Sequence, residues 1–182
     1  PGVSLPALML APANAKPGQS VLIVAEKGIA EAAGEDGPAQ GYLKDGYTVL
    51  AVDVRGLGET YPGVGKKVDK RIGADWEDYF RAYVLGRSYV GMRAEDILRS
   101  AAYLRDKGFA VRLAAYGNVG VPALHAAALE PSVFETVTIS GALRSWTDVI
   151  RARPAVNQLI NTVQGALKVY DLPDLAATLG DK

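Results

Sequence analysis

Short, uninterrupted apolar runs alternate with helix-forming segments along this chain, and the alternation limits the possible folds more than any other feature. Ser20–Ala25 and Tyr47–Val54 are continuous β-branched runs, typical of strands buried on both faces. Gly91–Lys107 carries apolar residues at helical spacing, and Gly108 is its predicted end. Because strands that alternate with helices form parallel βαβ units, we predict an α/β fold with a mostly parallel sheet and helices on both faces.

The rest of the chain supplies further strands and helices of this pattern. Strands are predicted at Leu5–Ala11, Ala110–Tyr116 and Phe134–Ile139, and helices at Pro38–Asp45, Asp75–Leu85 and Val119–Leu129. Residues 28–37 and 56–73 are rich in glycine and are predicted to be loops, the second of them long. From Ala142 onward the chain is predicted to be mostly helical, with Pro154 and Pro173 as breaks.

Length and composition exclude several classes of protein. The 182 residues suit a single domain, spanning 1–182. Lys plus Arg number 20 and so do Asp plus Glu, so there is no basic excess, and we predict neither nucleic acid nor a membrane as partner. The chain has no cysteine and one histidine, which excludes thiol nucleophiles and leads us to predict no metal site and no cofactor.

A strand, a tight glycine turn and a helix succeed one another around Gly117-Asn-Val-Gly120. This is the context of a nucleophile elbow, in which a sharp turn exposes the nucleophile and the helix amides stabilise an oxyanion. Aligning Gly120 with the last glycine of G-x-S-x-G places Asn118 at the serine position. Asparagine has no nucleophilic oxygen, so covalent acyl transfer cannot start there. The alternative is a plain β–α turn, and a dinucleotide site is disfavoured because Val119 replaces the second glycine of its fingerprint.

The stretch Asp53–Thr60 follows a buried strand and contains D-x-x-G, but no phosphate-binding loop precedes it. We predict a structural role, in which Asp53 and Arg55 cap loop amides and brace neighbouring turns. Arg55 and Glu59 remain candidates for lining a pocket at the carboxyl edge of the sheet, where ligands of such folds bind.

Three further residues were weighed as catalytic groups. His125 lies seven residues after Asn118 on a helix, roughly 9–10 Å further along the axis, so we predict a packed histidine and not a general base. Ser140 ends a predicted strand and is an alternative nucleophile, although it lies outside any elbow. Asp148 is either a triad acid or, as we prefer, an acid at the start of a helix.

Two long stretches of the chain resemble a known family. Gly46–Thr60 (GYTVLAVDVRGLGET) and Tyr83–Leu98 (YVLGRSYVGMRAEDIL) are similar to carbohydrate esterases of the α/β-hydrolase superfamily, in the acetyl xylan esterase group. Residues 126–131 (AAALEP) and 169–175 (VYDLPDL) are similar to that group as well. The resemblance implies the α/β-hydrolase fold and hydrolysis of esters of small molecules or acetylated carbohydrates. It also implies a fragment that ends before the last strands, with an acid and a histidine beyond Lys182.

Carried over by position, the resemblance gives Asn118 as the elbow residue, the Val119 amide as one oxyanion donor and the Lys27-Gly28 loop as the other. Without an elbow serine, two hypotheses stay open: an esterase-like hydrolase, or a non-catalytic binding or structural module that keeps the pocket. The oligomeric state and the compartment also stay open, and a secreted or periplasmic location is compatible with the resemblance.

Overall fold

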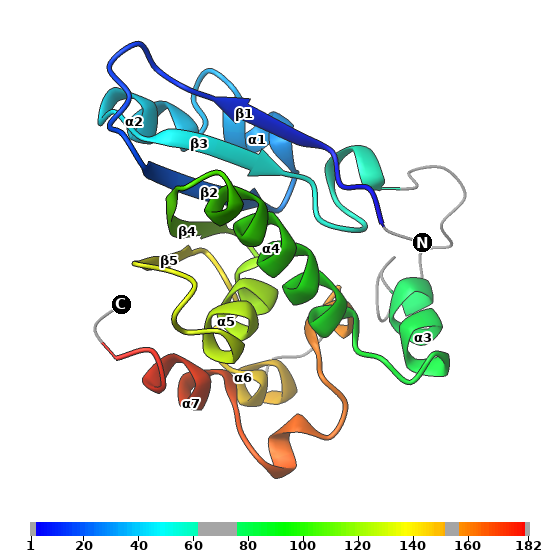
Figure 1. Ribbon diagram of the computed structural model, residues 1–182. Coiled ribbons are helices and arrows are strands. Elements are labelled where there is room, and N and C mark those ends of the chain that lie inside the picture. The colour runs from blue at the N-terminus through cyan, green and yellow to red at the C-terminus, as the bar shows by residue number, and fades with distance from the viewer. Residues whose placement is uncertain (1–2, 62–75, 152–156, 181–182) are drawn as a thin grey trace.

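A computed structural model describes residues 3–61, 76–151 and 157–180 of the protein. It contains one five-stranded sheet with the strand order β1-β3-β2-β4-β5 (Figure 1). The strands are β1 (Ala7–Leu10), β2 (Gln19–Ala25), β3 (Thr48–Val52), β4 (Ala110–Tyr116) and β5 (Val137–Ser140). The α-helices are α1 (Ile29–Ala33), α2 (Ala39–Lys44), α3 (Trp76–Val84), α4 (Tyr89–Asp106), α5 (Gly120–Leu129), α6 (Trp146–Arg151) and α7 (Leu172–Ala177). Short 3-10 helices are η1 (Gly58–Thr60), η2 (Leu159–Asn161) and η3 (Ala166–Lys168).

The sheet is mostly parallel, as predicted. β2 lies at its centre and pairs in parallel with β3 and with β4, so that Val21 is opposite Val49 on one side and Arg112 on the other. β4 pairs in parallel with β5, whereas β1 is an antiparallel edge strand beside β3. The carboxyl ends of the parallel strands therefore meet at one edge of the sheet, where α/β folds bind their ligands.

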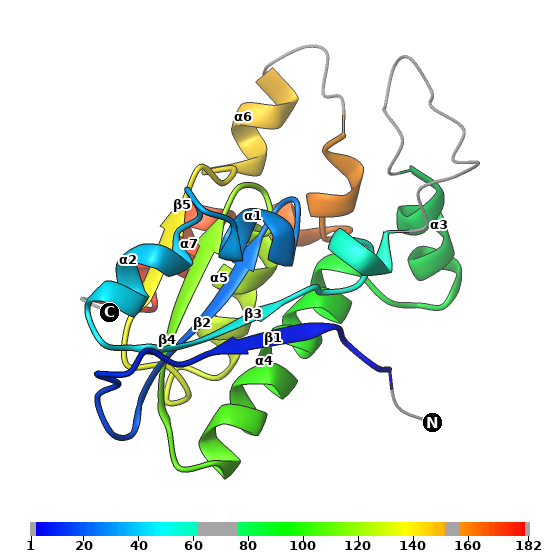
Figure 2. The same ribbon diagram turned by 90° about the horizontal axis from the view of Figure 1, so that it is seen from above.

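Helices cover both faces of the sheet, again as predicted (Figure 2). Along β2, Leu22 and Val24 pack into a core cluster with residues of α4 and α5. The alternate residues Val21 and Ile23 pack into a second cluster with residues of α1 and α2. The buried residues of both clusters have almost no exposed surface. Both faces of these strands are therefore apolar, and their sequences are continuous apolar runs instead of alternating ones.

Several boundaries differ from those expected. Residues 28–37, predicted to be loop, contain the short helix α1, and the predicted strand at 134–139 is shifted to Val137–Ser140. Phe134 instead precedes β5 and is 2 % exposed in the core, so its side chain is buried without belonging to a strand. Residues 62–73 of the expected long loop, and the expected break at Pro154, lie outside the described residues.

Within the segment after β5, the side chain of Asp171, the N-cap of α7, joins the start of α7 to the start of α6. Its carboxylate accepts hydrogen bonds from the Ser145 hydroxyl (2.6 Å), the Trp146 amide (2.8 Å) and the Thr147 hydroxyl (2.9 Å) at the start of α6. Partial burial acts to raise the pKa of this carboxyl, but the hydrogen bonds outweigh it and hold the pKa well below its ordinary value.

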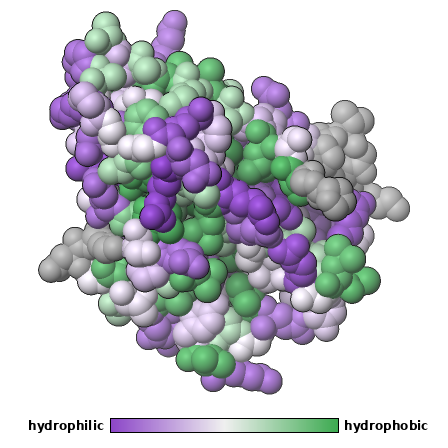
Figure 3. All heavy atoms as spheres, in the orientation of Figure 1, coloured by the Kyte–Doolittle hydropathy of each residue, from purple (hydrophilic) through white to green (hydrophobic). Residues whose placement is uncertain are grey.

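Apolar side chains also reach the surface. Val84, the last residue of α3, and Leu85 after it are 82 % and 70 % exposed, and apolar surface is scattered over the face seen in Figure 3. Across the described ranges, we find no helix with both the length and the apolar character needed to cross a membrane.

Candidate functional site

A cavity of about 470 Å³ opens at the carboxyl edge of the sheet. The loops after β2, β3 and β4, together with α4 and the segment around η2, supply its walls. Its lining consists of Glu26, Lys27, Gly56, Leu57, Gly58, Tyr61, Arg93, Asn118, Val119, Asn157, Ile160 and Asn161. Of the residues singled out in the sequence, Lys27, Asn118 and Val119 are therefore brought together here.

The turn after β4 is sharpest at Gly117, which has a left-handed φ of 80°. Among the described non-glycine residues only Asn157 has a positive φ, so Asn118 lies in an ordinary backbone conformation. In a nucleophile elbow the strained residue is the nucleophile itself. By the spacing of the motif, Asn118 occupies the serine position. By its backbone conformation, Gly117 occupies the place of the strained nucleophile. Neither residue carries a hydroxyl or thiol.

The carboxylate of Glu26 lies against this turn. Its Oε2 accepts a hydrogen bond from the Asn118 backbone amide and its Oε1 accepts one from the Asn118 side-chain amide, both at 3.2 Å. A Cβ atom added to Gly117 would lie 2.3 Å from Glu26 Oε2. Glu26 thus fills the space that a side chain at position 117 would need, and it contacts the residue that follows.

The two amides expected to face an oxyanion in the loop after β2 already have acceptors. The Lys27 amide donates to Glu31 Oε2 at 2.8 Å, and the Gly28 amide donates to the Ala25 carbonyl at 3.0 Å. In this conformation the two amides are hydrogen-bonded to residues of α1 and β2, and their role as oxyanion donors stays a prediction.

Asp53 joins two of the loops that surround the cavity. The side chain is 1 % exposed, and its Oδ1 accepts from the Ile29 amide (2.6 Å) while its Oδ2 accepts from the Glu59 amide (2.8 Å). A Cβ at Gly28 would lie 2.1 Å from Asp53 Oδ1, so glycine is required for this close approach. The predicted role of Asp53 as a cap for loop amides is confirmed.

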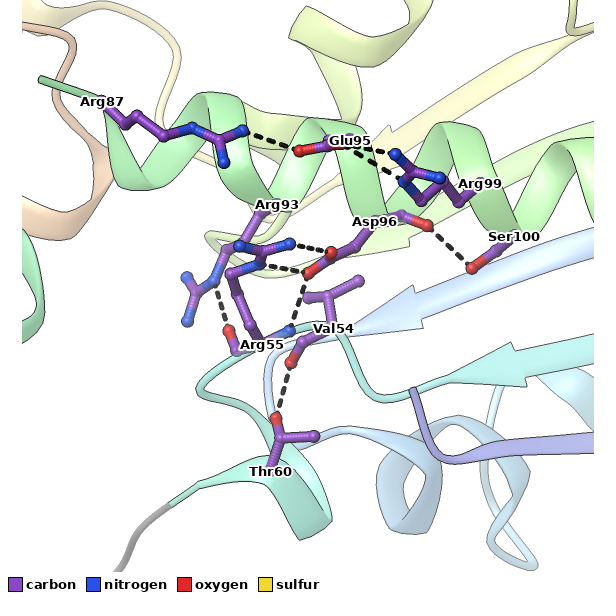
Figure 4. A network of polar contacts seen from close by, with 9 residues as sticks. All are labelled: Val54, Arg55, Thr60, Arg87, Arg93, Glu95, Asp96, Arg99 and Ser100. Atoms are coloured by element: carbon purple, nitrogen blue, oxygen red, sulfur yellow. Dashed lines mark hydrogen bonds and ion pairs between the residues drawn. The ribbon is translucent and has the colours of Figure 1, made fainter. Parts of the chain in front are cut away.

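Arg55 braces the same loop and does not line the cavity (Figure 4). Its guanidinium makes a two-point ion pair with the buried Asp96, with Nε 2.7 Å from Oδ2, and its backbone amide donates to the same oxygen at 3.1 Å. Arg93 Nε donates to the Arg55 carbonyl at 2.9 Å. The side-chain hydrogen bonds that Arg55 donates to Asp96 raise the pKa of Arg55 above its ordinary value.

The contacts in Figure 4 join two distant stretches of sequence, Gly46–Thr60 and Tyr83–Leu98. Arg55 belongs to one of them, and Arg93 and Asp96 belong to the other, so the two stretches bind each other. On the outer side of α4, Glu95 pairs with Arg99 and with Arg87, and their hydrogen bonds lower its pKa to about 2. The network fixes α4 against the loop after β3.

The other residues proposed to line a pocket lie elsewhere. Glu59 is exposed to solvent and is not part of the cavity lining. Asp148 is exposed in the first turn of α6. Ser140 is exposed at the end of β5, where its carbonyl accepts from the Gly117 amide at 2.8 Å. Ser140 thus lies beside the turn through its backbone, but neither these three residues nor Arg55 line the cavity.

His125 is a packed histidine, as predicted. It is 8 % exposed, with Nδ1 2.8 Å from the Val121 carbonyl and Nε2 3.0 Å from the Tyr170 hydroxyl, and its ring packs beside Trp146. The Val121 carbonyl can only accept, so Nδ1 carries the proton and Nε2 accepts from Tyr170. Burial lowers the pKa of His125, against a smaller opposing effect of the Val121 hydrogen bond.

Sequence reasoning missed the side chains of Glu26, Arg93 and Asn161. The available signal for Glu26 was its place directly after the central strand, beside the turn that follows β4. Asn161 follows a segment with no strand signal, so nothing in its sequence context indicated a cavity wall.

No protein-family model and no curated protein matches the sequence. Solved structures do match. A probable hydrolytic enzyme from Pseudomonas aeruginosa PAO1 superposes with a TM-score of 0.52 at 19% identity, over 80% of this chain and 39% of that one. Oligopeptidase B from Trypanosoma brucei superposes with a TM-score of 0.56 at 13% identity, over 88% of this chain and 21% of that one. The chain spans well under half the length of either protein, and the likeness at such identities concerns the fold.

Proposed function

We propose that this chain, which has the fold of the α/β hydrolases, binds a small-molecule ligand non-covalently in the cavity at the carboxyl edge of its sheet. One observation carries the proposal. At the turn where hydrolases of this fold hold a nucleophile, Gly117 has no side chain and Asn118 is hydrogen-bonded to Glu26. A covalent acyl intermediate needs a hydroxyl, thiol or similar nucleophile in that place.

The lining of the cavity supports binding. Among its described residues there is no serine, threonine or cysteine. Leu57, Val119 and Ile160 supply apolar surface, and amide and charged side chains supply a few hydrogen-bonding groups, a mixture typical of small-molecule pockets. The resemblance to carbohydrate esterases makes an ester of a small molecule or carbohydrate the ligand that we favour, held intact.

Ester hydrolysis is the second candidate. It is favoured by the position of the cavity at the start of α5 and by the hydrolytic enzymes that share the fold. Because the described lining holds no serine, threonine or cysteine, a water molecule is the nucleophile that we consider for attack on the ester carbonyl. Glu26 is the carboxylate in that lining that can accept a proton from this water. It would then pass the proton to the departing alkoxide, which leaves as the alcohol.

An assay with phenyl acetate separates the two candidates. We expect the natural protein and Glu26→Gln to hydrolyse it no faster than buffer, while the backbone amides of Asn118 and Val119 shift saturably in NMR spectra. Glu130→Gln, an exposed change at the far end of α5, is the control. Hydrolysis by the natural protein that is lost in Glu26→Gln would contradict the binding proposal and favour the hydrolase.

A third variant tests whether the missing hydroxyl prevents turnover. Asn118→Ser restores a hydroxyl at the aligned position, so activity that appears only in this variant would attribute inactivity to the missing nucleophile.

A further inference from the structure

Asn161, in η2, has a side chain whose polarity the fold does not use. The residue lines the cavity and is 1 % exposed. Its backbone is well bonded, since its carbonyl accepts from Trp146 Nε1 at 2.8 Å and its amide donates to the Gln158 carbonyl at 3.2 Å. Its side-chain Nδ2 lies 3.5 Å from Gln158 Oε1, at the limit of a hydrogen bond, and its Oδ1 has no partner within the described part of the chain.

A side-chain amide at this position lowers the stability of the fold and gives it nothing in return. A buried acceptor without a donor loses its hydration and gains nothing in return, so such atoms are rare in native proteins and call for an explanation. The two backbone hydrogen bonds would survive with any side chain. Leucine, of similar size, would fill the same space without the unpaired oxygen. The side-chain amide therefore has to be explained by something that the cavity receives.

We infer that Asn161 Oδ1 accepts a hydrogen bond from an O–H or N–H group of the ligand, and that the ligand carries a compact apolar body beside this group. The inference rests on the proposed binding function. The last torsion of asparagine is broad, so a turn of the amide plane brings Oδ1 to the cavity at little cost. Leu57, Val119 and Ile160 provide the apolar surface for the body of the ligand.

The other polar groups of the lining are already engaged. Glu26 is bonded to Asn118, and Arg93 Nε donates to the Arg55 carbonyl while its guanidinium lies over the Tyr89 ring at 4.8 Å. Lys27 is an exposed donor, which a ligand donor cannot use. Among the buried side chains of the described lining, Asn161 is the one whose acceptor has no partner, so it can distinguish a ligand with a donor from one with only acceptors.

The first arm of the test measures stability without ligand. In urea unfolding, we expect Asn161→Leu to leave the midpoint unchanged or to raise it, because an unpaired buried acceptor is removed. Thr60→Val is the comparison, since the Thr60 hydroxyl is paired with the Val54 carbonyl at 2.9 Å and its loss should lower the midpoint. A fall for Asn161→Leu as large as that for Thr60→Val would overturn the inference.

The second arm measures binding with two matched probes, benzyl alcohol and benzyl methyl ether, by NMR shifts of the Val119 and Asn161 amides. The natural protein should bind the alcohol about five- to tenfold more tightly than the ether, the worth of one hydrogen bond. Asn161→Leu should bind both equally. Equal binding to the natural protein, or an undiminished preference in Asn161→Leu, would overturn this inference alone. Binding of neither probe would contradict the proposed function as well.

Discussion

At the scale of single residues, the turn after β4 is defined by Gly117 and Glu26. The positive φ of Gly117 turns the chain from strand to helix, and the carboxylate of Glu26 lies over it. A serine at position 117 would collide with this carboxylate, so a nucleophile could return there only together with a change at Glu26.

His125 allows a pH prediction, because it is the only histidine of the sequence. Burial lowers its pKa in the folded protein, so between the unfolded value, about 6.5, and the lower folded value the unfolded chain binds more protons. Stability must then fall as the pH falls through this window, by at most about 1.4 kcal/mol per pH unit for one proton. Urea unfolding from pH 7.5 to 5.0 should show this slope in the natural protein and a flatter one in His125→Gln. Identical slopes in the two proteins would refute the prediction that His125 causes this pH dependence.

At the scale of elements, the loops around the cavity are held by carboxylates that come from outside it. Asp53 ties the loop after β2 to η1, and Asp96 of α4 ties down Arg55. Neither carboxylate lines the cavity, so each acts on the shape of the site through the backbone that it caps.

Asp53→Asn should therefore loosen two loops at once. The side-chain NH₂ group of the new asparagine would face a backbone amide that is itself a donor, and the hydrogen bonds to a charged acceptor would be lost. We expect the free energy of unfolding to fall by about 2–3 kcal/mol. The amides of Ile29 and Glu59 should also exchange their hydrogens faster. Asp45→Asn, an exposed change, is the control, and equal losses in both variants would contradict the bridging role.

The sequence predicted the elements better than it predicted the site. β2 and β3 were predictable because continuous β-branched runs have few alternatives, whereas α1 was missed because glycines at its two ends suggested a loop. The role of Asp53 followed from its place at a strand end. The Glu26–Asn118 contact did not, because it joins residues 92 positions apart. The position of the sharp turn was also hidden, since glycine and asparagine both tolerate a positive φ.

At the scale of the whole molecule, one carboxylate joins the starts of α6 and α7 in the segment beyond β5. Asp171 gathers the start of α6 and begins α7, which packs against α5 within a third apolar cluster. The lowered pKa of Asp171 means that its contribution to stability is complete above the unfolded pKa, about 3.9. It is lost as the pH falls towards the folded value.

Asp171→Asn should accordingly lower the free energy of unfolding at pH 7, by about 1–2 kcal/mol for the weakened cap. The difference from the natural protein should shrink below pH 4, where this carboxyl becomes protonated in the unfolded chain while it stays ionised in the folded one. Urea unfolding at pH 7 and pH 3 measures both differences. Asp174 also caps α7 and accepts from the Asp171 amide at 2.7 Å, so Asp174→Asn is a neighbouring comparison without the contacts to α6. A gap that stays constant with pH would contradict this account.

The strand order has a consequence for how the protein reaches its native state. β2 lies near the start of the sequence, but its partner β4 lies about 90 residues later, as the pairing of Gln19 with Ala110 illustrates. Contacts of such separation form slowly, because a long loop must close before they contribute. Glu26 and Asn118 meet across this same pair of strands, so the cavity is completed only when the slowest pairing is made. A ligand of the cavity would therefore recognise fully folded chains and stabilise them selectively against partly folded ones.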